Sequence, residues 1–251
     1  MSGHSKWSSI KHQKGVADAR RGQLFTKLAR EIIVAVREGG ANQEVNFRLR
    51  LAVQKAHDSN MPHENIERAI KRGSGETDGV SIVEMMLEGY GPGGAAVMVQ
   101  ALTDNRNRTL QDIRNIFSRN GASLGESGCV AWLFDQRGFI TVSIKGLDVE
   151  EIELQAIDAG ADDVKVEGDN VEIYTRPEAM ERIRVALEEQ NLPITSSELI
   201  MMSKNMIGLD EKAALQIMKL LDKLEELDEV QGVTTNADLP GNVAEKYQSS
   251  V

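Results

Sequence analysis

Residues 139–202 read FITVSIKGLDVEEIELQAIDAGADDVKVEGDNVEIYTRPEAMERIRVALEEQNLPITSSELIMM. Short runs rich in β-branched residues alternate here with two amphipathic segments, which predicts strand, helix, strand, strand, helix and strand in that order. The expected helices span 149–159 and 177–190, and the expected strands span 139–144, 164–167, 171–174 and 197–202. This order is the ferredoxin-like signature. We therefore expect a complete ferredoxin-like α+β domain over residues 137–203.

The elements on either side of that domain form an incomplete set. Before it we expect strands at 82–90 and 95–103, a helix at 106–120 and a strand at 129–134, and after it a helix at 211–227 and a strand at 230–236. The simplest use of the trailing helix and strand is to complete the earlier sheet. Residues 77–136 and 204–240 are thus expected to form one discontinuous α+β domain that carries the ferredoxin-like domain as an insertion, with residues 241–251 as a tail.

The first 76 residues show the helical period instead. A helix is expected over residues 16–38, a second from Asn46, which suits an N-cap, and a third from Pro62, which suits a first turn, to Gly73. The Gly-rich stretch 73–79 that follows has the composition of a linker. The predicted fold class is α+β multidomain, with a basic N-terminal three-helix domain (1–76) ahead of the α+β domain and its insertion.

Charge is distributed very unevenly along the chain. Residues 1–75 carry 14 Lys or Arg and 7 Asp or Glu, net +7, whereas the remainder carries 15 and 32, net −17. An acidic protein with a basic N-terminus that bears aromatic and His residues favours one localised contact with a polyanion such as nucleic acid. The alternative for such a charge run is a solvated tail and helix face.

The candidate nucleic-acid-binding residues all lie in the first forty positions. Arg20, Lys27, Arg30 and Arg37 occupy a sector about 100° wide on the first helix, away from its apolar side chains. Trp7 could stack on a base or pack internally, and His4 and His12 could contact phosphate or remain exposed. The full set is His4, Lys6, Trp7, Lys11, His12, Lys14, Arg20, Arg21, Lys27, Arg30 and Arg37.

Other motifs give weaker indications. Arg106 and Arg108 could form a second anion contact, although the segment 104–109 also suits helix capping. Gly89, Gly91 and Gly94 match a dinucleotide-binding pattern, but a strand follows where that motif needs a helix, so a turn is expected. Cys129 has apolar neighbours and is expected to be a small core residue rather than a nucleophile. We expect no metal, no cofactor and no catalytic constellation.

Composition narrows the class of protein further. No apolar run approaches the roughly 20 residues of a membrane span, and a single cysteine excludes an intrachain disulfide. No apolar segment follows the N-terminal charges as a secretory signal requires. A cytoplasmic protein without membrane contact is therefore expected, whereas the oligomeric state cannot be inferred from sequence.

Several motifs together resemble the YebC/PmpR family, over essentially the whole chain. They are Gly3-His4-Ser5-Lys6-Trp7, Arg21-Gly22, Phe25-Thr26-Lys27, Asn60-Met61-Pro62 with Ile66 and Ala69-Ile70, Glu88 through Gly94, Asp104 through Thr109, and Asn236-Ala237-Asp238. The resemblance implies a helical domain followed by two α+β domains, one inserted in the other.

The family resemblance also implies a function. It implies a DNA-binding transcriptional regulator. Similarity to mitochondrial relatives implies instead a ribosome-associated translation factor that binds RNA and relieves stalling at proline-rich stretches. We expect a non-enzymatic nucleic-acid-binding regulator of gene expression, and an enzyme with a site between the α+β domains is the third alternative.

Overall fold

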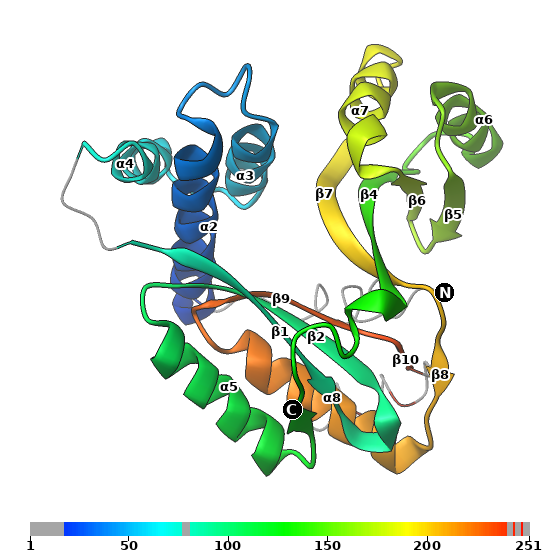
Figure 1. The fold of residues 1–251 in the computed structure, drawn as a ribbon. Helices are drawn as coiled ribbons and strands as arrows, with labels where there is room; N and C mark the ends of the chain where they lie inside the picture. The colour runs from blue at the N-terminus through cyan, green and yellow to red at the C-terminus, as the bar shows by residue number, and fades with distance from the viewer. Residues whose placement is uncertain (1–17, 77–80, 240–242, 244–246, 248–251) are drawn as a thin grey trace. The chain divides into compact units, whose positions relative to one another are not determined.

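The computed structural model describes residues 18–76, 81–239, 243 and 247, and Figure 1 shows its fold. The N-terminal domain contains helices α2 (Asp18–Gly39), α3 (Phe47–Asp58) and α4 (His63–Gly73). Asn46 caps α3 as expected, because its side-chain oxygen accepts the N–H of Leu49 at 3.0 Å. Its amide group also donates to the carbonyls of Ala35 and Gly40, both at 2.7 Å, which ties the start of α3 to the end of α2.

Helices α2 and α4 approach each other closely. A Cβ added to Gly73 would lie 2.6 Å from the Cβ of Val36 and 2.9 Å from the carbonyl oxygen of Ile33. The absence of a side chain at Gly73 therefore lets the last turn of α4 pack directly on α2. Ile32, Ile66 and Ala69 are buried in this small helical core.

The first sheet has the strand order β3-β1-β2-β9 and is antiparallel throughout. Its strands are β1 (Val83–Tyr90), β2 (Ala96–Thr103), β3 (Ser123–Leu124) and β9 (Val230–Thr235). Strand β9 pairs with β2 although about 130 residues separate them, so the trailing helix and strand complete the earlier sheet, as expected. The 3-10 turn η1 (Pro92–Gly94) joins β1 to β2, which confirms that the glycine motif is a turn between strands.

Helices α5 (Arg106–Arg119) and α8 (Glu211–Glu225) contribute to one core with this sheet (Figure 1). Val97, Val99 and Ala101 alternate along β2 toward Phe117 of α5 and Leu221 of α8, all fully buried. The two short strands β8 (Ile207–Gly208) and β10 (Ala237–Asp238) pair in parallel as a separate ribbon. The described C-terminal residues Val243 and Tyr247 belong to the same core.

The second sheet has the order β5-β6-β4-β7, the arrangement of a ferredoxin-like domain. The chain runs through β4 (Phe134–Ser143), α6 (Val149–Ala159), β5 (Asp163–Glu167), β6 (Asn170–Thr175), the 3-10 turn η3 (Pro177–Ala179), α7 (Met180–Glu189) and β7 (Ile194–Ser203). Ile140 and Ile173 pair on the central strands and are fully buried, as are Ile152 of α6 and Ile183 of α7. The predicted fold class is confirmed.

One predicted strand is wrong. Residues 129–134 do not form a strand of the first domain. They contain the 3-10 turn η2 (Ala131–Leu133), and Phe134 instead begins the long strand β4 of the second sheet. The physical reason is that backbone N–H groups in and beside this segment bind Glu88. They are therefore not available for hydrogen bonds to a neighbouring strand. The carboxylate of Glu88 accepts the N–H groups of Gly128, Val130 and Ala131 at 2.7–2.8 Å.

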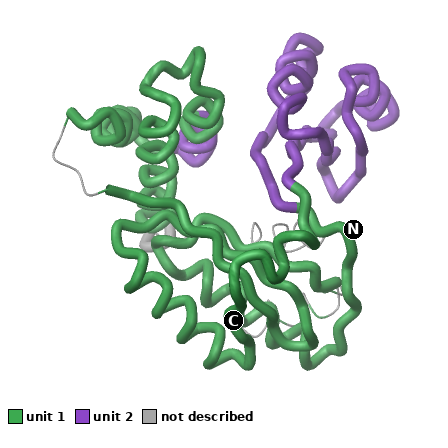
Figure 2. The backbone as a smooth tube through the Cα atoms, viewed as in Figure 1, with its two compact units in different colours: residues 1–53, 61–135, 202–251 green, residues 54–60, 136–201 purple. Residues whose placement is uncertain are grey.

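The chain consists of two compact units, coloured in Figure 2. Unit 1 comprises residues 1–53, 61–135 and 202–251, and unit 2 comprises residues 54–60 and 136–201. Unit 2 contains 7 Lys or Arg and 16 Asp or Glu, net −9, so nearly all of the chain's net charge of −10 lies in it. The basic helices α2 and α4 belong to unit 1.

Candidate nucleic-acid interface

Six of the candidate binding residues lie outside the described part of the chain. They are His4, Lys6, Trp7, Lys11, His12 and Lys14. The side chain of Arg20 is also outside the description, although its backbone belongs to α2, and Arg21 is exposed on the same turn of that helix. The contact of this segment with nucleic acid therefore stays a prediction from sequence.

The predicted basic stripe on α2 has neighbours within unit 1. The Lys27 ammonium donates to the carbonyl of Glu225 at 2.6 Å, and Nη2 of Arg30 lies 3.7 Å from Oε1 of Glu229. Nη1 of Arg37 donates to the hydroxyl of Ser81 at 3.4 Å, a long and therefore weak hydrogen bond. Lys27 and Arg30 are half-buried, whereas Arg37 is exposed. The stripe is thus not a uniformly solvated face.

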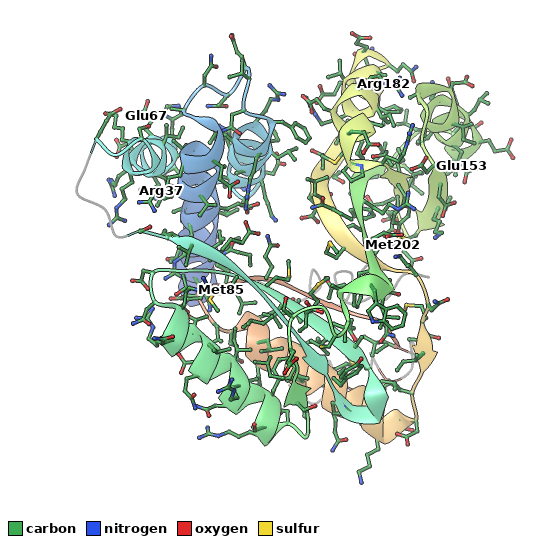
Figure 3. The ribbon with its side chains drawn as sticks, viewed as in Figure 1. Arg37, Glu67, Met85, Glu153, Arg182 and Met202 are labelled. Carbon is green, nitrogen blue, oxygen red and sulfur yellow. The ribbon has the colours of Figure 1, made fainter. Side chains whose placement is uncertain are left out.

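A groove of about 430 Å³ opens where α2 and α4 meet, and four arginines line it. Arg30 and Arg37 come from α2, and Arg68 and Arg72 come from α4; Figure 3 labels Arg37. Asn65 of α4 also lines the groove. Among the described residues that line it, Asp104 is the one with a negative charge. We call this feature the arginine groove, and its lining favours an anionic ligand.

The arginine groove contains two basic residues that the sequence-based prediction omitted, Arg68 and Arg72. Their spacing of four residues places them on one face of α4, a signal present in the sequence. What the sequence does not reveal is that this face lies beside Arg30 and Arg37, because that depends on the close packing of α4 on α2 at Gly73. Tertiary packing thus gathers arginines that are up to 42 positions apart in the chain.

Arg30 has an unsatisfied hydrogen-bonding group. Its Nη1 atom is buried and, within the described part of the chain, has no hydrogen-bond partner. Its Nη2 atom approaches Glu229 only at 3.7 Å. A buried donor without a partner is costly, and a water or a bound acceptor would satisfy it. Arg30 therefore retains hydrogen-bonding capacity beside the arginine groove.

The possible second anion contact is already engaged in ion pairs. Nη2 of Arg108 lies 2.8 Å from Oδ1 of Asp104 and 2.9 Å from Oε1 of Glu229. The carboxylate of Asp104, assisted by that of Glu229, raises the pKa of Arg108. The side chain of Asn105 accepts the N–H of Arg108 and caps α5, so helix capping in this motif is confirmed. Arg106 is exposed.

Glu88 and Cys129 meet in a compact loop. Tyr90 and Trp132 both donate to the carbonyl of Cys129, at 3.0 and 3.1 Å. The Cys129 thiol is half-buried, and desolvation together with the negative charge of Glu88 raises its pKa. A thiol with a raised pKa is a poor nucleophile at neutral pH. This environment suits a structural role for Cys129.

The described residues contain neither a metal-binding cluster nor a helix that could span a membrane. Across residues 18–76 and 81–239, with 243 and 247, no group of three or more His, Cys, Asp or Glu side chains could hold a metal ion. In the same part of the chain, no helix has the length and apolar character that crossing a membrane requires.

The fold is that of a multidomain α+β protein, and its helical domain carries a groove lined by arginines. Family models described as the TACO1/YebC protein N-terminal domain and the TACO1/YebC second and third domain match residues 5–76 and 82–237. The chain belongs to the TACO1/YebC family, which confirms the resemblance seen in the sequence motifs.

Individual relatives cover the full chain. A probable transcriptional regulatory protein of Dehalococcoides mccartyi is 58% identical over 249 residues, 99% of each chain. Another, of Chloroflexus aggregans, is 51% identical over 252 residues, 99% of this chain and 100% of the relative. The crystal structure of a conserved hypothetical protein from Aquifex aeolicus superposes with a TM-score of 0.87 at 47% identity, covering 94% of this chain and 97% of that one.

Proposed function

We propose that this protein is a non-enzymatic, nucleic-acid-binding regulator of gene expression that contacts phosphate groups through its helical domain. The names of its relatives, probable transcriptional regulatory proteins, support the regulatory part of this proposal. The binding part rests on the residues of this chain. A regulator of this kind acts in the cytoplasm, where nucleic acid is accessible to it.

The observation that carries the proposal is the gathering of Arg30, Arg37, Arg68 and Arg72 around one groove in a chain of net charge −10. Like charges repel, so four guanidinium groups around one cavity raise the free energy of the unliganded protein. A bound anion lowers it. Phosphate binding also releases the counterions condensed on nucleic acid, which is the main driving force of such contacts. The basic residues of the N-terminal segment, Lys6, Lys11 and Lys14 among them, would extend the same contact along a strand.

The contact proposed here positions the protein and does not read a sequence. Arginine and lysine on a helix face supply electrostatic attraction and bidentate phosphate binding. Specific readout of duplex DNA requires an element placed in the major groove with side chains that reach base edges. Contacts of arginine and lysine with phosphate therefore favour binding that depends strongly on salt and weakly on nucleic-acid sequence.

The test is a set of fluorescence-anisotropy titrations of the full chain against labelled duplex DNA and labelled single-stranded RNA at several salt concentrations. We expect log K to fall linearly with log salt. Changing Arg37, Arg68 and Arg72 together to Gln should make the slope shallower by about 0.7–0.9 per lost phosphate contact. The matched control is Arg114→Gln with Arg119→Gln and Arg182→Gln, three exposed or half-exposed arginines on other helices.

The outcomes separate clearly. A slope that changes equally in the groove variant and the control would mean that only net charge matters and would remove the arginine groove from the mechanism. If the chain binds neither the duplex DNA nor the single-stranded RNA, the proposal itself is overturned.

The choice between DNA and RNA is made by crosslinking in cells, followed by sequencing of both nucleic acids, alongside gradient sedimentation. Recovery of one recurrent promoter sequence would assign the protein to transcription. Comigration with ribosomes that is lost at high salt would assign it to translation.

A further inference from the structure

The arginine groove has an apolar lining as well as a basic one. Phe25 and Ile33 of α2 line it together with Met61, two residues before α4, and Ala69 in the middle of α4. Its volume of about 430 Å³ falls in the range of pockets that hold small molecules, roughly 300–1,000 Å³. A surface that only met the outside of a duplex would need cations but no such apolar cavity.

We propose, building on the function above, that the arginine groove holds one nucleotide unit of a single-stranded nucleic acid. The phosphate lies against Arg68 and Arg72, and the unpaired base lies against Phe25 and Met61. A base in a duplex is stacked and paired and cannot enter a cavity of this size, whereas an unpaired base can turn into it. The ligand chemistry is thus a phosphate joined to an aromatic heterocycle.

The basic part of the lining suits a phosphate. Arg68 and Arg72 lie one helical turn apart, a rise of about 6 Å along α4, and both are exposed. Two guanidinium groups at this spacing can bind the oxygens of one phosphate or of two successive ones. Arg30, which lines the same groove, adds a third positive charge beside them.

The apolar part of the lining suits a base. Phe25 is half-buried, so part of its ring is accessible, and Met61, which is 5% exposed, also lines the groove. Aromatic rings stack on any base, and thioethers make favourable contacts with aromatic rings. Stacking does not discriminate strongly between bases, which agrees with the weak sequence dependence expected above.

The experiment uses the full chain and three probes: inorganic phosphate, adenosine 5′-monophosphate and a labelled ten-nucleotide single-stranded RNA. We expect the RNA to bind, the monophosphate to compete weakly and phosphate alone to compete least. Changing Phe25 to Ser should weaken RNA binding about tenfold at unchanged salt slope, because stacking releases no counterions. Changing Arg68 and Arg72 to Gln should reduce the magnitude of the slope by about 1.4.

The control for the arginine variant is Arg114→Gln with Arg119→Gln, which removes the same charge from exposed positions on α5. Circular dichroism establishes that each variant is folded. If the Phe25 variant does not fold, photo-crosslinking of the wild-type chain to a 4-thiouridine RNA replaces it, and the crosslinks should include residues in 25–37 or 61–72.

Two results would overturn the inference. If the groove variants bind the ten-nucleotide RNA as the control does, or if no crosslink maps to residues 25–37 or 61–72, a nucleotide does not occupy the groove. The proposed function survives that result, provided that the chain still binds nucleic acid in a salt-dependent way. If the monophosphate binds but the RNA does not, the groove holds a free nucleotide. The inference that it holds one unit of a single-stranded nucleic acid is then wrong.

Discussion

At the scale of single residues, Glu88 shows how one buried carboxylate organises a segment 40 residues further along the chain. Glu88 is 5% exposed, and its oxygens accept three backbone N–H groups from residues 128–131. Burial opposes its ionisation, but the three donors outweigh that effect and lower its pKa. The loop is therefore held by the ionised form of Glu88.

We expect Glu88→Gln to lower the free energy of unfolding by about 1.5–3 kcal/mol, because a neutral amide replaces a charged acceptor. Since the pKa of Glu88 is lower in the folded state, its contribution is fully present above the ordinary Glu pKa of about 4.3 and is lost as pH falls through the folded value. Urea unfolding at pH 7 and below pH 4 measures this difference. The exposed Glu126→Gln on the same loop is the control, and an equal effect of both changes at pH 7 would contradict the assignment.

At the scale of elements, the packing of α4 on α2 creates the arginine groove. A Cβ at Gly73 would lie 2.6 Å from Val36, so this contact tolerates only glycine without movement of a helix. Gly22 of α2 offers a comparison, since a Cβ added there would meet nothing within 4 Å. Alanine substitutions at these two positions therefore distinguish the effect of helix propensity from that of helix packing.

We expect Gly73→Ala to destabilise the protein by about 1–3 kcal/mol through overpacking, and Gly22→Ala to stabilise it by about 0.5–1 kcal/mol through backbone entropy. Thermal unfolding followed by circular dichroism measures both. A Gly73→Ala variant as stable as the wild type would mean that α2 and α4 are not in this close contact.

The elements also show what can be predicted from sequence and what cannot. The order of the ferredoxin-like domain and the caps at Asn46 and Asn105 were predictable, because period and capping chemistry are local. The strand expected at 129–134 was wrong, because a carboxylate distant in sequence binds its backbone. Arg68 and Arg72 were omitted for a similar reason, since the packing of two helices makes them neighbours of Arg30 and Arg37.

At the scale of the whole molecule, the account depends on the separation of charge along the chain. The first 14 residues supply Lys6, Lys11 and Lys14 but few apolar side chains. We expect their removal to leave the rest of the chain folded, as thermal unfolding followed by circular dichroism would show, and to weaken nucleic-acid binding. The loss of up to three phosphate contacts should make the salt slope shallower by about 2–3. A folded truncation that binds as tightly as the full chain would exclude this segment from the contact.

The central claim is that the basic helical domain, and not the acidic inserted domain, meets the nucleic acid. Hydrogen exchange of the full chain with and without a saturating single-stranded RNA tests it directly, because each peptide reports its own protection. We predict slower exchange in peptides from residues 18–39 and 63–73, with no change in peptides from residues 136–201. Protection confined to residues 136–201 would contradict the account.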